Sequence, residues 1–278
     1  RTSELLDSRN PLTYIILLTW NRWEDTEACL QSLLPVVKEH CRVLVADNGS
    51  TDGTPENIRR RFPQFEVHEN GNNLGFPAGN NVGIRCALAA GADYVILLNN
   101  DTVVDTRFVE ELVAAAQRNP SAGMINSLIF FHDRPSVVWF AGGDISTWTG
   151  RSRHAGYLQA DRGQFTGDAP IGRPCACSLL VTRRFLETVG LMREGLFLYG
   201  EEIDWNEMYA GFSSQVDWPG LHYWHEASIA FPGAKVVHTE RDEEDWWASF
   251  STTIGKFHTV LDQVPLPPNL NAFFGTVK

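Results

Sequence analysis

Short runs of apolar residues alternate with segments of helical period through the first half of the chain. The apolar runs are rich in Ile, Leu and Val, which predicts strands that are buried on both faces. They occupy residues 12–18, 43–46, 65–67 and 94–98. Between them, apolar side chains recur with the i, i+3, i+4, i+7 spacing of a helix, in Leu30, Leu33, Leu34 and Val37 and in Val109, Leu112, Val113 and Ala116. Strands that alternate with helices over short connections predict an α/β fold with a mostly parallel sheet flanked by helices.

Local signals place two helix boundaries and a change of pattern near residue 130. Thr54 and Pro55 predict a helix start, with the threonine hydroxyl as N-cap and proline in the first position. Gly91 predicts the end of an alanine-rich helix that begins near Gly79. Residues 131–174 are rich in Gly, Arg, Trp and Asp without a sustained period, which predicts loops with short strands. Regular patterning returns at residues 178–181 and 183–189.

The composition is that of a globular chain and limits its environment. The chain has 278 residues, of which 43% are hydrophobic. Its longest apolar run, Tyr14–Trp20, is far shorter than the roughly 20 residues of a membrane span. No basic leader followed by an apolar stretch opens the sequence, so we expect no signal peptide. The five cysteines form no C-x-x-C pair and no zinc-type spacing with His, which favours a reducing, cytoplasmic location over a disulfide framework.

The net charge of −11 at pH 7 excludes some partners and constrains others. Nucleic-acid-binding proteins usually carry a basic surface, and membrane-surface helices are rich in Lys and Arg; the sequence shows neither feature. An anionic ligand such as a nucleoside diphosphate would meet an opposing field. We therefore expect a divalent cation to neutralise it locally.

Three polar clusters each follow a predicted strand directly. They are Thr19–Arg22, Asp47–Gly53 and Asn99–Asp101. Any one of them could be ordinary turn chemistry, because Asn, Asp, Gly and Ser favour turns for backbone reasons. Ligands of parallel α/β sheets bind at the carboxyl ends of the strands, so three such clusters in register predict a ligand site.

Asp101 is the strongest candidate for a metal ligand among these residues. A carboxylate at the end of a buried strand is costly to desolvate unless a cation or a donor meets it. Oxygen ligands from a carboxylate, a diphosphate and water suit Mg²⁺ or Mn²⁺. The alternative is that Asp101 caps the following helix, but Asp105 and Thr106 are better placed for that role.

Two further segments carry candidate chemistry. Residues 72–81 combine small residues, which let a ligand approach the backbone, with the start of a helix, which favours anions. In residues 200–205, three carboxylates lie so close together that mutual repulsion would raise at least one pKa, which suits proton abstraction. The alternative for the second segment is an acidic first helical turn that complements the helix dipole.

The chain resembles the inverting glycosyltransferase family 2, in its bacterial rhamnosyltransferase-like branch. The resemblance rests on the order of these segments along the chain: Thr19–Arg22, Asp47–Gly53, Asn73–Asn81, Asn99–Asp101, Gly200–Asp204 and His225. The resemblance covers about residues 12–238 and implies a GT-A fold, with a Rossmann-like sheet and a mixed second half. It implies a nucleotide-sugar-binding half at 12–130, an acceptor-binding and catalytic half at 131–238, and a C-terminal tail at 239–278 that packs on them. It also implies that the nucleotide sugar contacts Thr19, Asn21, Arg22, Asp47, Asn48, Ser50, Asn73, Gly75, Asn80, Asn99 and Asn100.

The same resemblance assigns the metal and the chemistry. Residues 99–101 are similar to the family's D-x-D motif with Asn in the first position, which leaves Asp101 as the main carboxylate on Mn²⁺ or Mg²⁺. His225 follows two aromatic residues, which alone is typical of packing, but it aligns with a His that completes the metal shell in some members. Glu202 falls at the position of the catalytic base. Two neighbouring carboxylates would orient the base or the acceptor, namely Glu201 and Asp204.

The resemblance implies inverting, metal-dependent transfer of a sugar from a nucleotide diphosphate sugar, of the dTDP-rhamnose or UDP-hexose type, to an acceptor hydroxyl. The Q-x-x-R-W signature of processive members is absent, and so are their membrane helices, so we expect one sugar per encounter. The acceptor could be a lipid-linked glycan, a polysaccharide end or a small molecule, and a position at the inner face of the membrane is compatible with the first. The sequence predicts no nucleic-acid partner and no integral membrane segment, and it does not indicate the oligomeric state.

Two other interpretations of the function remain open at this point. A sugar-1-phosphate nucleotidyltransferase shares the sheet and the metal, but it needs a Gly-rich basic loop after the first strand, where residues 19–22 offer one Arg and no Gly. A non-catalytic nucleotide-sugar-binding protein would keep Asp47 and Asp101 but has no need of Glu202. A dinucleotide dehydrogenase is disfavoured, because no G-x-G-x-x-G follows the first strand.

Overall fold

The computed structural model describes residues 10–145 and 152–194, all of which belong to one compact unit of the chain. They hold the predicted nucleotide-binding half and the first part of the predicted second half. The predictions for Glu201, Glu202, Asp204 and His225 lie outside the described residues, as does the predicted tail at 239–278.

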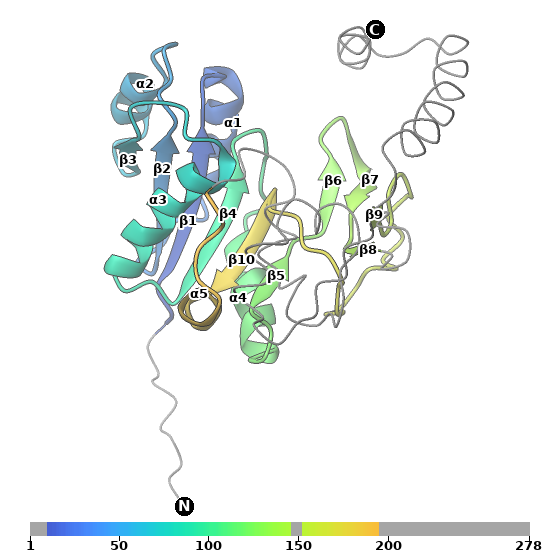
Figure 1. The fold of residues 1–278 in the computed structure, drawn as a ribbon. Coiled ribbons are helices and arrows are strands. Elements are labelled where there is room, and N and C mark those ends of the chain that lie inside the picture. Colours follow the sequence, from blue (N-terminus) through green and yellow to red (C-terminus); the bar gives the residue numbers. More distant parts are fainter. Residues whose placement is uncertain (1–9, 146–151, 195–278) are drawn as a thin grey trace, which may run out of the picture. The chain divides into compact units, whose positions relative to one another are not determined.

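A six-stranded sheet forms the centre of the described unit (Figure 1). Its strands, in spatial order, are β3 (Glu66–Glu69), β2 (Cys41–Asp47), β1 (Thr13–Thr19), β4 (Tyr94–Asn99), β10 (Ser178–Thr182) and β5 (Met124–Asn126). β1 pairs in parallel with β2 and β4, and β2 pairs in parallel with β3, whereas β10 runs antiparallel to β4 and β5. The predicted strands therefore form a parallel block, which confirms the expected fold class, and β10 makes the sheet mixed.

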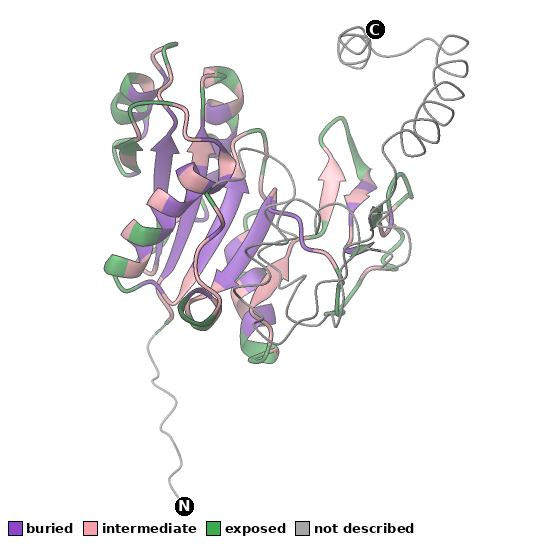
Figure 2. Cartoon of the chain, viewed as in Figure 1, coloured by how far each residue is buried: buried purple, intermediate pink, exposed green. Residues whose placement is uncertain are grey.

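Helices cover both faces of this sheet, because the central strands carry apolar side chains on both sides. One face packs against α1 (Trp23–Leu33), α2 (Thr54–Arg61) and α4 (Phe108–Arg118), and the other against α3 (Phe76–Ala89) and α5 (Arg183–Thr188). In β1, Ile15 and Leu17 belong to the first core, and Tyr14 and Ile16 belong to the second. Figure 2 shows the central strands buried along most of their length, with exposed positions on the outer sides of the helices.

The helix boundaries agree with the sequence signals in part. Gly91 follows α3 with a φ of +87°, as expected for a residue that ends a helix. α2 begins at Thr54, but its N-cap residue is Gly53, and the Thr54 hydroxyl donates to Oδ1 of Asp52 at 2.6 Å. The prediction that Thr54 caps this helix is therefore wrong, because the Asp52 carboxylate is a strong acceptor that takes the hydroxyl proton. α3 begins at Phe76, a few residues before the predicted start.

Between β5 and β10 the chain forms two small antiparallel sheets, as the irregular composition predicted. β6 (Ile129–Phe131) pairs with β7 (Arg134–Phe140), and β8 (Gly143–Ile145) pairs with β9 (Ser152–His154). The imidazole of His154 packs edge-on against Trp139 and Phe140, with ring centroids 5.3 and 5.2 Å apart. These contacts give the insertion a small aromatic core of its own.

Two sequence expectations about the environment can be compared with the described residues. No helix within residues 10–145 and 152–194 is long and apolar enough to cross a membrane. All five cysteines lie in these ranges and are free thiols, as expected from their odd number and spacing.

Candidate functional site

The candidate site lies where the strand order reverses, between β1 and β4. From β1 the chain continues to β2 and β3 on one side, and β4 lies on the other side. Parallel α/β sheets bind ligands at this point, beyond the carboxyl ends of the strands. The register places Thr19 opposite Asp47, and Leu18 opposite Asn99. The three polar clusters predicted from the sequence therefore meet at one edge of the sheet.

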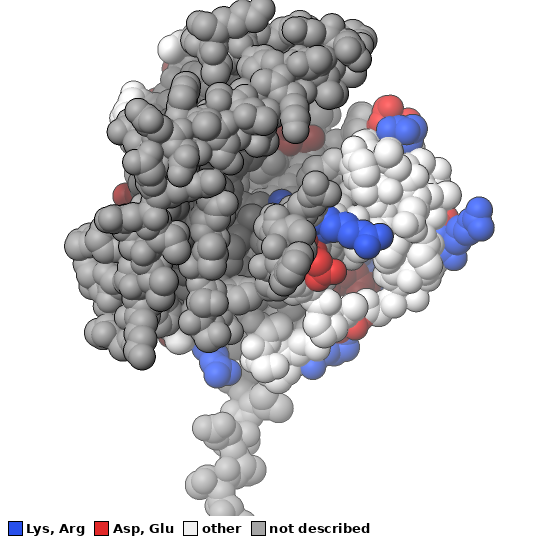
Figure 3. Space-filling model, turned by 45° about the vertical axis from the view of Figure 1, so that its right-hand side comes forward, with Lys and Arg blue, Asp and Glu red and all other residues white. Residues whose placement is uncertain are grey.

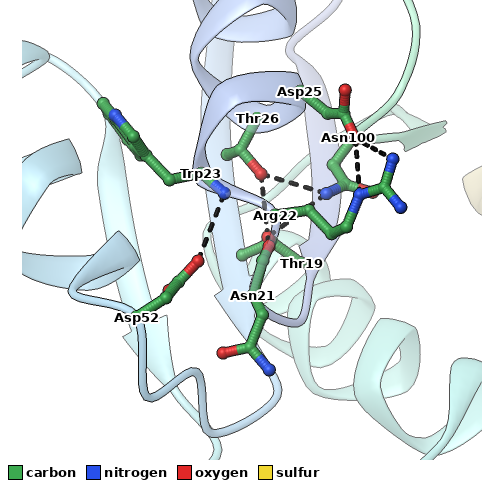
Figure 4. A network of polar contacts seen from close by, with 8 residues as sticks. All are labelled: Thr19, Asn21, Arg22, Trp23, Asp25, Thr26, Asp52 and Asn100. Atoms are coloured by element: carbon green, nitrogen blue, oxygen red, sulfur yellow. Dashed lines mark hydrogen bonds and ion pairs between the residues drawn. The ribbon is translucent and has the colours of Figure 1, made fainter.

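A buried hydrogen-bond network joins the first and third clusters, with its side chains turned toward one another (Figure 4). The hydroxyls of Thr19 and Thr26 lie 3.0 Å apart, and Nδ2 of Asn100 donates to Thr26 at 3.0 Å and to Thr19 at 3.4 Å. These bonds fix the turn after β4 relative to the end of β1. Sequence reasoning missed Thr26, although its helical spacing from Cys29 and Leu33 places it on the buried face of α1.

The first cluster is also bonded to the second. The N–H of Asn21 donates to Oγ of Ser50 at 2.7 Å, and its Oδ1 accepts the N–H of Thr51 at 2.9 Å. Arg22 follows with a left-handed φ of +61°, and its guanidinium donates to Asp25 (Figure 4). The Arg22 side chain is 73% exposed. Asn21 and Ser50 therefore hold two loops together, while Arg22 lies at the surface of α1.

Asp47 is a buried carboxylate with one bonded oxygen and one oxygen without a partner. Its side chain is 1% exposed, and Oδ2 accepts the N–H groups of Gly49 and Ser50 at 3.0 and 2.9 Å. Oδ1 is buried and has no hydrogen-bond partner among the described residues. A buried carboxylate oxygen without a donor is costly, so this arrangement suits a ligand that brings a donor.

The loop between β3 and α3 closes the site beside β2. Nδ2 of Asn48 donates to the carbonyl of Gly75 at 3.1 Å and to Oδ1 of Asn73 at 3.3 Å. Oδ1 of Asn48 accepts from Nδ2 of Asn70 at 2.8 Å. Oδ1 of Asn70 is buried and, like Oδ1 of Asp47, lacks a partner in the described part of the chain. Asn70 is thus a second open acceptor, which sequence reasoning missed because the residue stands before the segment singled out.

Two glycines allow these loops to approach each other closely. Gly49 has a φ of +76°, and a Cβ at this position would lie 2.8 Å from Cα of Asn72. A Cβ at Gly79 would lie 2.6 Å from Cδ1 of Leu18 and 2.7 Å from Oδ1 of Asn48. The loop after β2 can therefore pack against the β3–α3 loop and against α3 only because both positions lack a side chain.

Asn80 and Asn81 lie in α3, and the structure gives them different partners. Nδ2 of Asn80 donates to the carbonyl of Phe76 at 3.0 Å, so this side chain stabilises the first turn of its own helix. Asn81 binds the backbone of Met192 instead: Nδ2 donates to the carbonyl at 2.7 Å, and Oδ1 accepts the N–H at 3.1 Å. Sequence reasoning missed this role of Asn81, because its partner is 111 positions away.

Asp101 follows Asn100 at the carboxyl end of β4 and is exposed. No hydrogen bond within the described part of the chain engages its carboxylate. Asp105, and not Asp101, bonds to the backbone just before α4: its Oδ1 accepts the N–H of Arg107 at 2.8 Å. The Asp101 carboxylate therefore has no partner in the described part of the chain that would compete with a ligand.

The groups around Asp101 suit a divalent ion that arrives with an anionic ligand. Burial, with a smaller contribution from the charge of Asp101, raises the pKa of Cys29 and of Cys177 to about 12. Both thiols are therefore protonated at neutral pH, which leaves the Asp101 carboxylate as the charged oxygen group beside them. Within the described ranges, no group of three or more His, Cys, Asp or Glu side chains could hold a metal ion. Since Mg²⁺ is commonly held by one or two carboxylates together with substrate phosphates, Asp101 fits an ion whose other ligands come from a diphosphate.

A wide cleft extends from Asp101 on the side of β4 that faces β10 and β5. Its volume is about 1720 Å³, and it is lined by α4, by β5, by the small-sheet region formed by β6 and β7, and by the loop before β10. None of the described lining residues belongs to β1, β2 or β3 or to the loops that follow them. The cleft and the first three strands therefore form two separate regions that meet at Asp101.

On the face shown in Figure 3, the Lys and Arg side chains of the described residues stand singly or beside acidic ones and form no continuous basic patch.

Two family models match this sequence. The model described as glycosyl transferase family 2 matches residues 14–179, which is more than half of the 278 residues. The model described as sulfotransferase domain matches residues 192–276, a range that lies almost entirely outside the described residues.

Curated relatives match over most of this chain. The N-acetylglucosaminyl-diphospho-decaprenol L-rhamnosyltransferase of Mycobacterium tuberculosis is 28% identical in an alignment 250 positions long, which covers 81% of this chain and 75% of that protein. The dTDP-rhamnosyl transferase RfbF of Shigella flexneri is 24% identical over 197 residues, which are 70% of this chain and 62% of that protein.

Solved structures match at the level of the fold. GalNAc-T7 with UDP, GalNAc and Mn²⁺ matches with a TM-score of 0.53 and 15% identity, over 72% of this chain and 40% of that chain. The mannosyltransferase PcManGT from Pyrobaculum calidifontis, in complex with GDP-Man and Mn²⁺, matches with a TM-score of 0.48 and 16% identity, over 70% of this chain and 50% of that chain. The chain spans half or less of the length of these two solved structures.

Proposed function

Because the chain belongs to glycosyl transferase family 2 and has the GT-A fold, we propose that it transfers a sugar from a nucleotide diphosphate sugar to an acceptor hydroxyl. The transfer is one displacement with inversion at the anomeric carbon, through an oxocarbenium-like transition state related to that of glycosidases. In this proposal, residues 12–130 bind the donor, residues 131–238 bind the acceptor, and residues 239–278 pack on them.

The observation that carries the proposal is the pair of open acceptors at the nucleoside position. Oδ1 of Asp47 and Oδ1 of Asn70 are buried without partners among the described residues. The loops around them are held by their own hydrogen bonds, so both oxygens are left to accept from a bound ligand. A nucleoside presents both N–H and O–H donors, which suits two such acceptors. The residues that would surround the nucleoside are Thr19, Asn21, Asn73, Gly75 and Asn80.

Asp101 is the proposed ligand of the divalent ion, Mn²⁺ or Mg²⁺, and His225 is the proposed second ligand from the protein. A bound ion would neutralise the nucleoside diphosphate as it leaves. The chain itself, at a net charge of −11, opposes the binding of a diphosphate. Asn100 supports Asp101 by bonding the turn to Thr19 and Thr26, which leaves the carboxylate itself unoccupied.

Glu202 is the proposed general base, and it would take the proton of the acceptor hydroxyl as the oxygen attacks the anomeric carbon. Glu201 and Asp204 would orient it. The support for this assignment is the resemblance of residues 200–205 to the family's pattern, in which Glu202 falls at the position of the base.

The relatives suggest the classes of donor and acceptor. One is named a dTDP-rhamnosyl transferase, and the other an L-rhamnosyltransferase of N-acetylglucosaminyl-diphospho-decaprenol. We therefore place dTDP-rhamnose ahead of a UDP-hexose as donor, and a lipid-linked glycan ahead of a polysaccharide end or a small molecule as acceptor. The five free thiols support a reducing, cytoplasmic location.

A thermal-shift panel followed by a transfer assay tests this function on the full chain. The panel compares dTDP-rhamnose and UDP-hexoses with and without MnCl₂, because a ligand at 100 times its Kd adds about 2.7 kcal/mol of stability. Glu202→Gln should bind the donor like the wild type, yet transfer sugar at least about 100-fold more slowly.

Each alternative predicts a different result in these assays. The absence of stabilisation by any nucleotide sugar contradicts the proposal. Unimpaired transfer by Glu202→Gln contradicts the base assignment alone. Synthesis of a nucleotide sugar from a sugar 1-phosphate and a nucleoside triphosphate would identify a nucleotidyltransferase. Donor binding without transfer to any acceptor would favour a non-catalytic binding protein.

A second candidate function concerns the C-terminal part of the chain. The sulfotransferase domain model matches residues 192–276, a range that contains Glu202 and His225. As the alternative, these residues would belong to a site that transfers a sulfuryl group, with one of them accepting the proton of a hydroxyl. Incubation of the full chain with a ³⁵S-labelled sulfonucleotide and the same acceptors tests this candidate. Labelled acceptor would support it, and unlabelled acceptor would count against it.

A further inference from the structure

We propose that the hydroxyl pair of Ser127 and Ser178 forms the subsite for the sugar ring of the donor. This inference rests on the proposed function. It adds a binding position for the monosaccharide itself, which neither the family match nor the relatives assign. Both serines line the same cleft as Asp101.

Their place in the sheet puts the two serines next to Asp101, on the side away from the nucleoside. Ser178 begins β10, which pairs with β4, and the N–H of Asn99 donates to the carbonyl of Cys177 at 3.0 Å. Ser127 follows β5, on the far side of β10. Neighbouring strands lie about 4.8 Å apart, so the hydroxyl of Ser178 on β10 is about one sugar ring from the end of β4. A diphosphate held at Asp101 would therefore direct its sugar toward this pair.

The pair retains hydrogen-bonding capacity for a ligand. The two Oγ atoms lie 2.6 Å apart, so one hydroxyl donates to the other. Each hydroxyl has one hydrogen and two lone pairs, and therefore one hydrogen and several lone pairs remain after this bond forms. No other hydrogen bond from the described residues engages either hydroxyl. Because sugar hydroxyls both donate and accept, a pair that offers both functions is a suitable partner for them.

Asn126 holds the pair in position without using its hydroxyls. Nδ2 of Asn126 donates to the carbonyls of Cys175 and Ser178 at 2.7 and 2.9 Å, and its Oδ1 accepts the N–H of Cys175 at 3.0 Å. These bonds tie the end of β5 to the loop before β10. The neighbouring thiol of Cys177 is neutral, since burial raises its pKa to about 12, and it adds a small uncharged wall. The subsite is thus rigid and carries no charge of its own, which suits a neutral sugar.

Ser127→Ala in the full chain tests the inference. The affinities to measure are those for dTDP-rhamnose, or for another nucleotide sugar that stabilises the wild type, and for the matching free nucleoside diphosphate, both with MnCl₂. We expect the affinity for the nucleotide sugar to fall about threefold to tenfold, as for the loss of one hydrogen bond, and the affinity for the diphosphate to stay unchanged. Ser136→Ala removes an exposed hydroxyl on β7 that does not line the cleft, and both affinities should keep their wild-type values.

The other outcomes overturn the inference in distinguishable ways. An equal loss for sugar and diphosphate, or no loss for either, overturns the subsite and leaves the proposed function intact. A change confined to the KM of the acceptor assigns the pair to the acceptor and overturns the donor subsite. A wild type that binds neither ligand overturns the proposed function as well. Should Ser127→Ala unfold, Ser127→Cys keeps the size of the side chain with a weak donor, and the same comparison applies.

Discussion

The two sides of β4 are built in different ways. On the side of β1 and β2, polar side chains bond to one another across loops, as in the network of Thr19, Thr26 and Asn100. On the side of β10 and β5, a cleft of about 1720 Å³ lies beside the small-sheet region. The first region has its geometry fixed before a ligand binds, so little free energy is lost in ordering it. The second region keeps room for a large ligand.

The largest expected effect lies at Asp101, where the two regions meet. Asp101→Asn removes the charge and keeps the shape. We expect metal-dependent sugar transfer to fall about 100-fold or more, because neutralising the leaving diphosphate contributes several kcal/mol to the transition state. Thermal unfolding should hardly change, since the side chain is exposed. Initial rates over a MnCl₂ titration measure the effect, and wild-type rates in this variant would show that the regions do not meet at a metal.

The next effect tests how tightly the nucleoside side is packed. Gly49→Ala forces a left-handed φ and places a Cβ 2.8 Å from Cα of Asn72. We expect the free energy of unfolding to fall by about 2–3 kcal/mol and nucleotide binding to weaken. Gly91→Ala is the matched control, because Gly91 has a similar φ of +87° with no atom within 4 Å of the added Cβ. It should cost only about 1 kcal/mol. Equal losses in urea denaturation would mean that the loop contact contributes nothing.

A smaller effect is expected where α3 binds the segment after α5. Asn81→Ala leaves the backbone N–H and carbonyl of Met192 without their partner, and Met192 is 2% exposed. We expect a loss of about 2 kcal/mol in the free energy of unfolding. Arg85→Ala removes only the exposed ion pair with Glu194 and should cost less than about 1 kcal/mol. If both variants unfold at the same urea concentration, the buried amide does not hold this segment.

The smallest effect is on the pH dependence of stability, and it concerns the carboxylates of Asp52 and Asp168, which lie on opposite sides of β4. Burial raises the pKa of Asp52, but hydrogen bonds from Thr54 and from the N–H of Trp23 outweigh it, and the pKa is lowered overall. Hydrogen bonding from Arg118 lowers the pKa of Asp168. Because both folded-state pKa values lie below the unfolded ones, each group stabilises the fold above its unfolded pKa, and this contribution is lost as the pH falls through the folded pKa.

Asp52→Asn and Asp168→Asn should therefore be slightly less stable than the wild type at pH 7. The difference should begin to shrink as the pH falls below the unfolded pKa, near 4, and should vanish only below the lowered folded-state pKa values, where the wild-type carboxylates are protonated as well. Unfolding curves at pH 7, 5 and 3 measure this dependence. A difference of the same size at pH 7, 5 and 3 would show that the carboxylates act through shape and not through charge.

Three strands of the parallel block, β1, β2 and β4, could be predicted from the sequence because they are nearly continuous apolar runs. The polar residues at the strand ends, such as Asp47 and Asp101, could be found for the same reason, since a strand end is visible in the local pattern. The bonds of Asn81 to Met192 and of Asn126 to Cys175 could not be predicted, because they join positions 111 and 49 residues apart. Thr54 was misassigned because a local rule for helix caps takes no account of a competing carboxylate two residues earlier.

The burial of the thiols gives the protein an internal reporter of local opening. Burial raises the pKa of Cys41 on β2 to about 11 and that of Cys177 beside the cleft to about 12, so almost no reactive thiolate exists in the folded state at neutral pH. Alkylation of the buried Cys41 should then follow the opening of the structure around it, while alkylation of Cys177 also reports on access through the cleft. The two labelling rates therefore compare the two sides of β4 without an introduced cysteine.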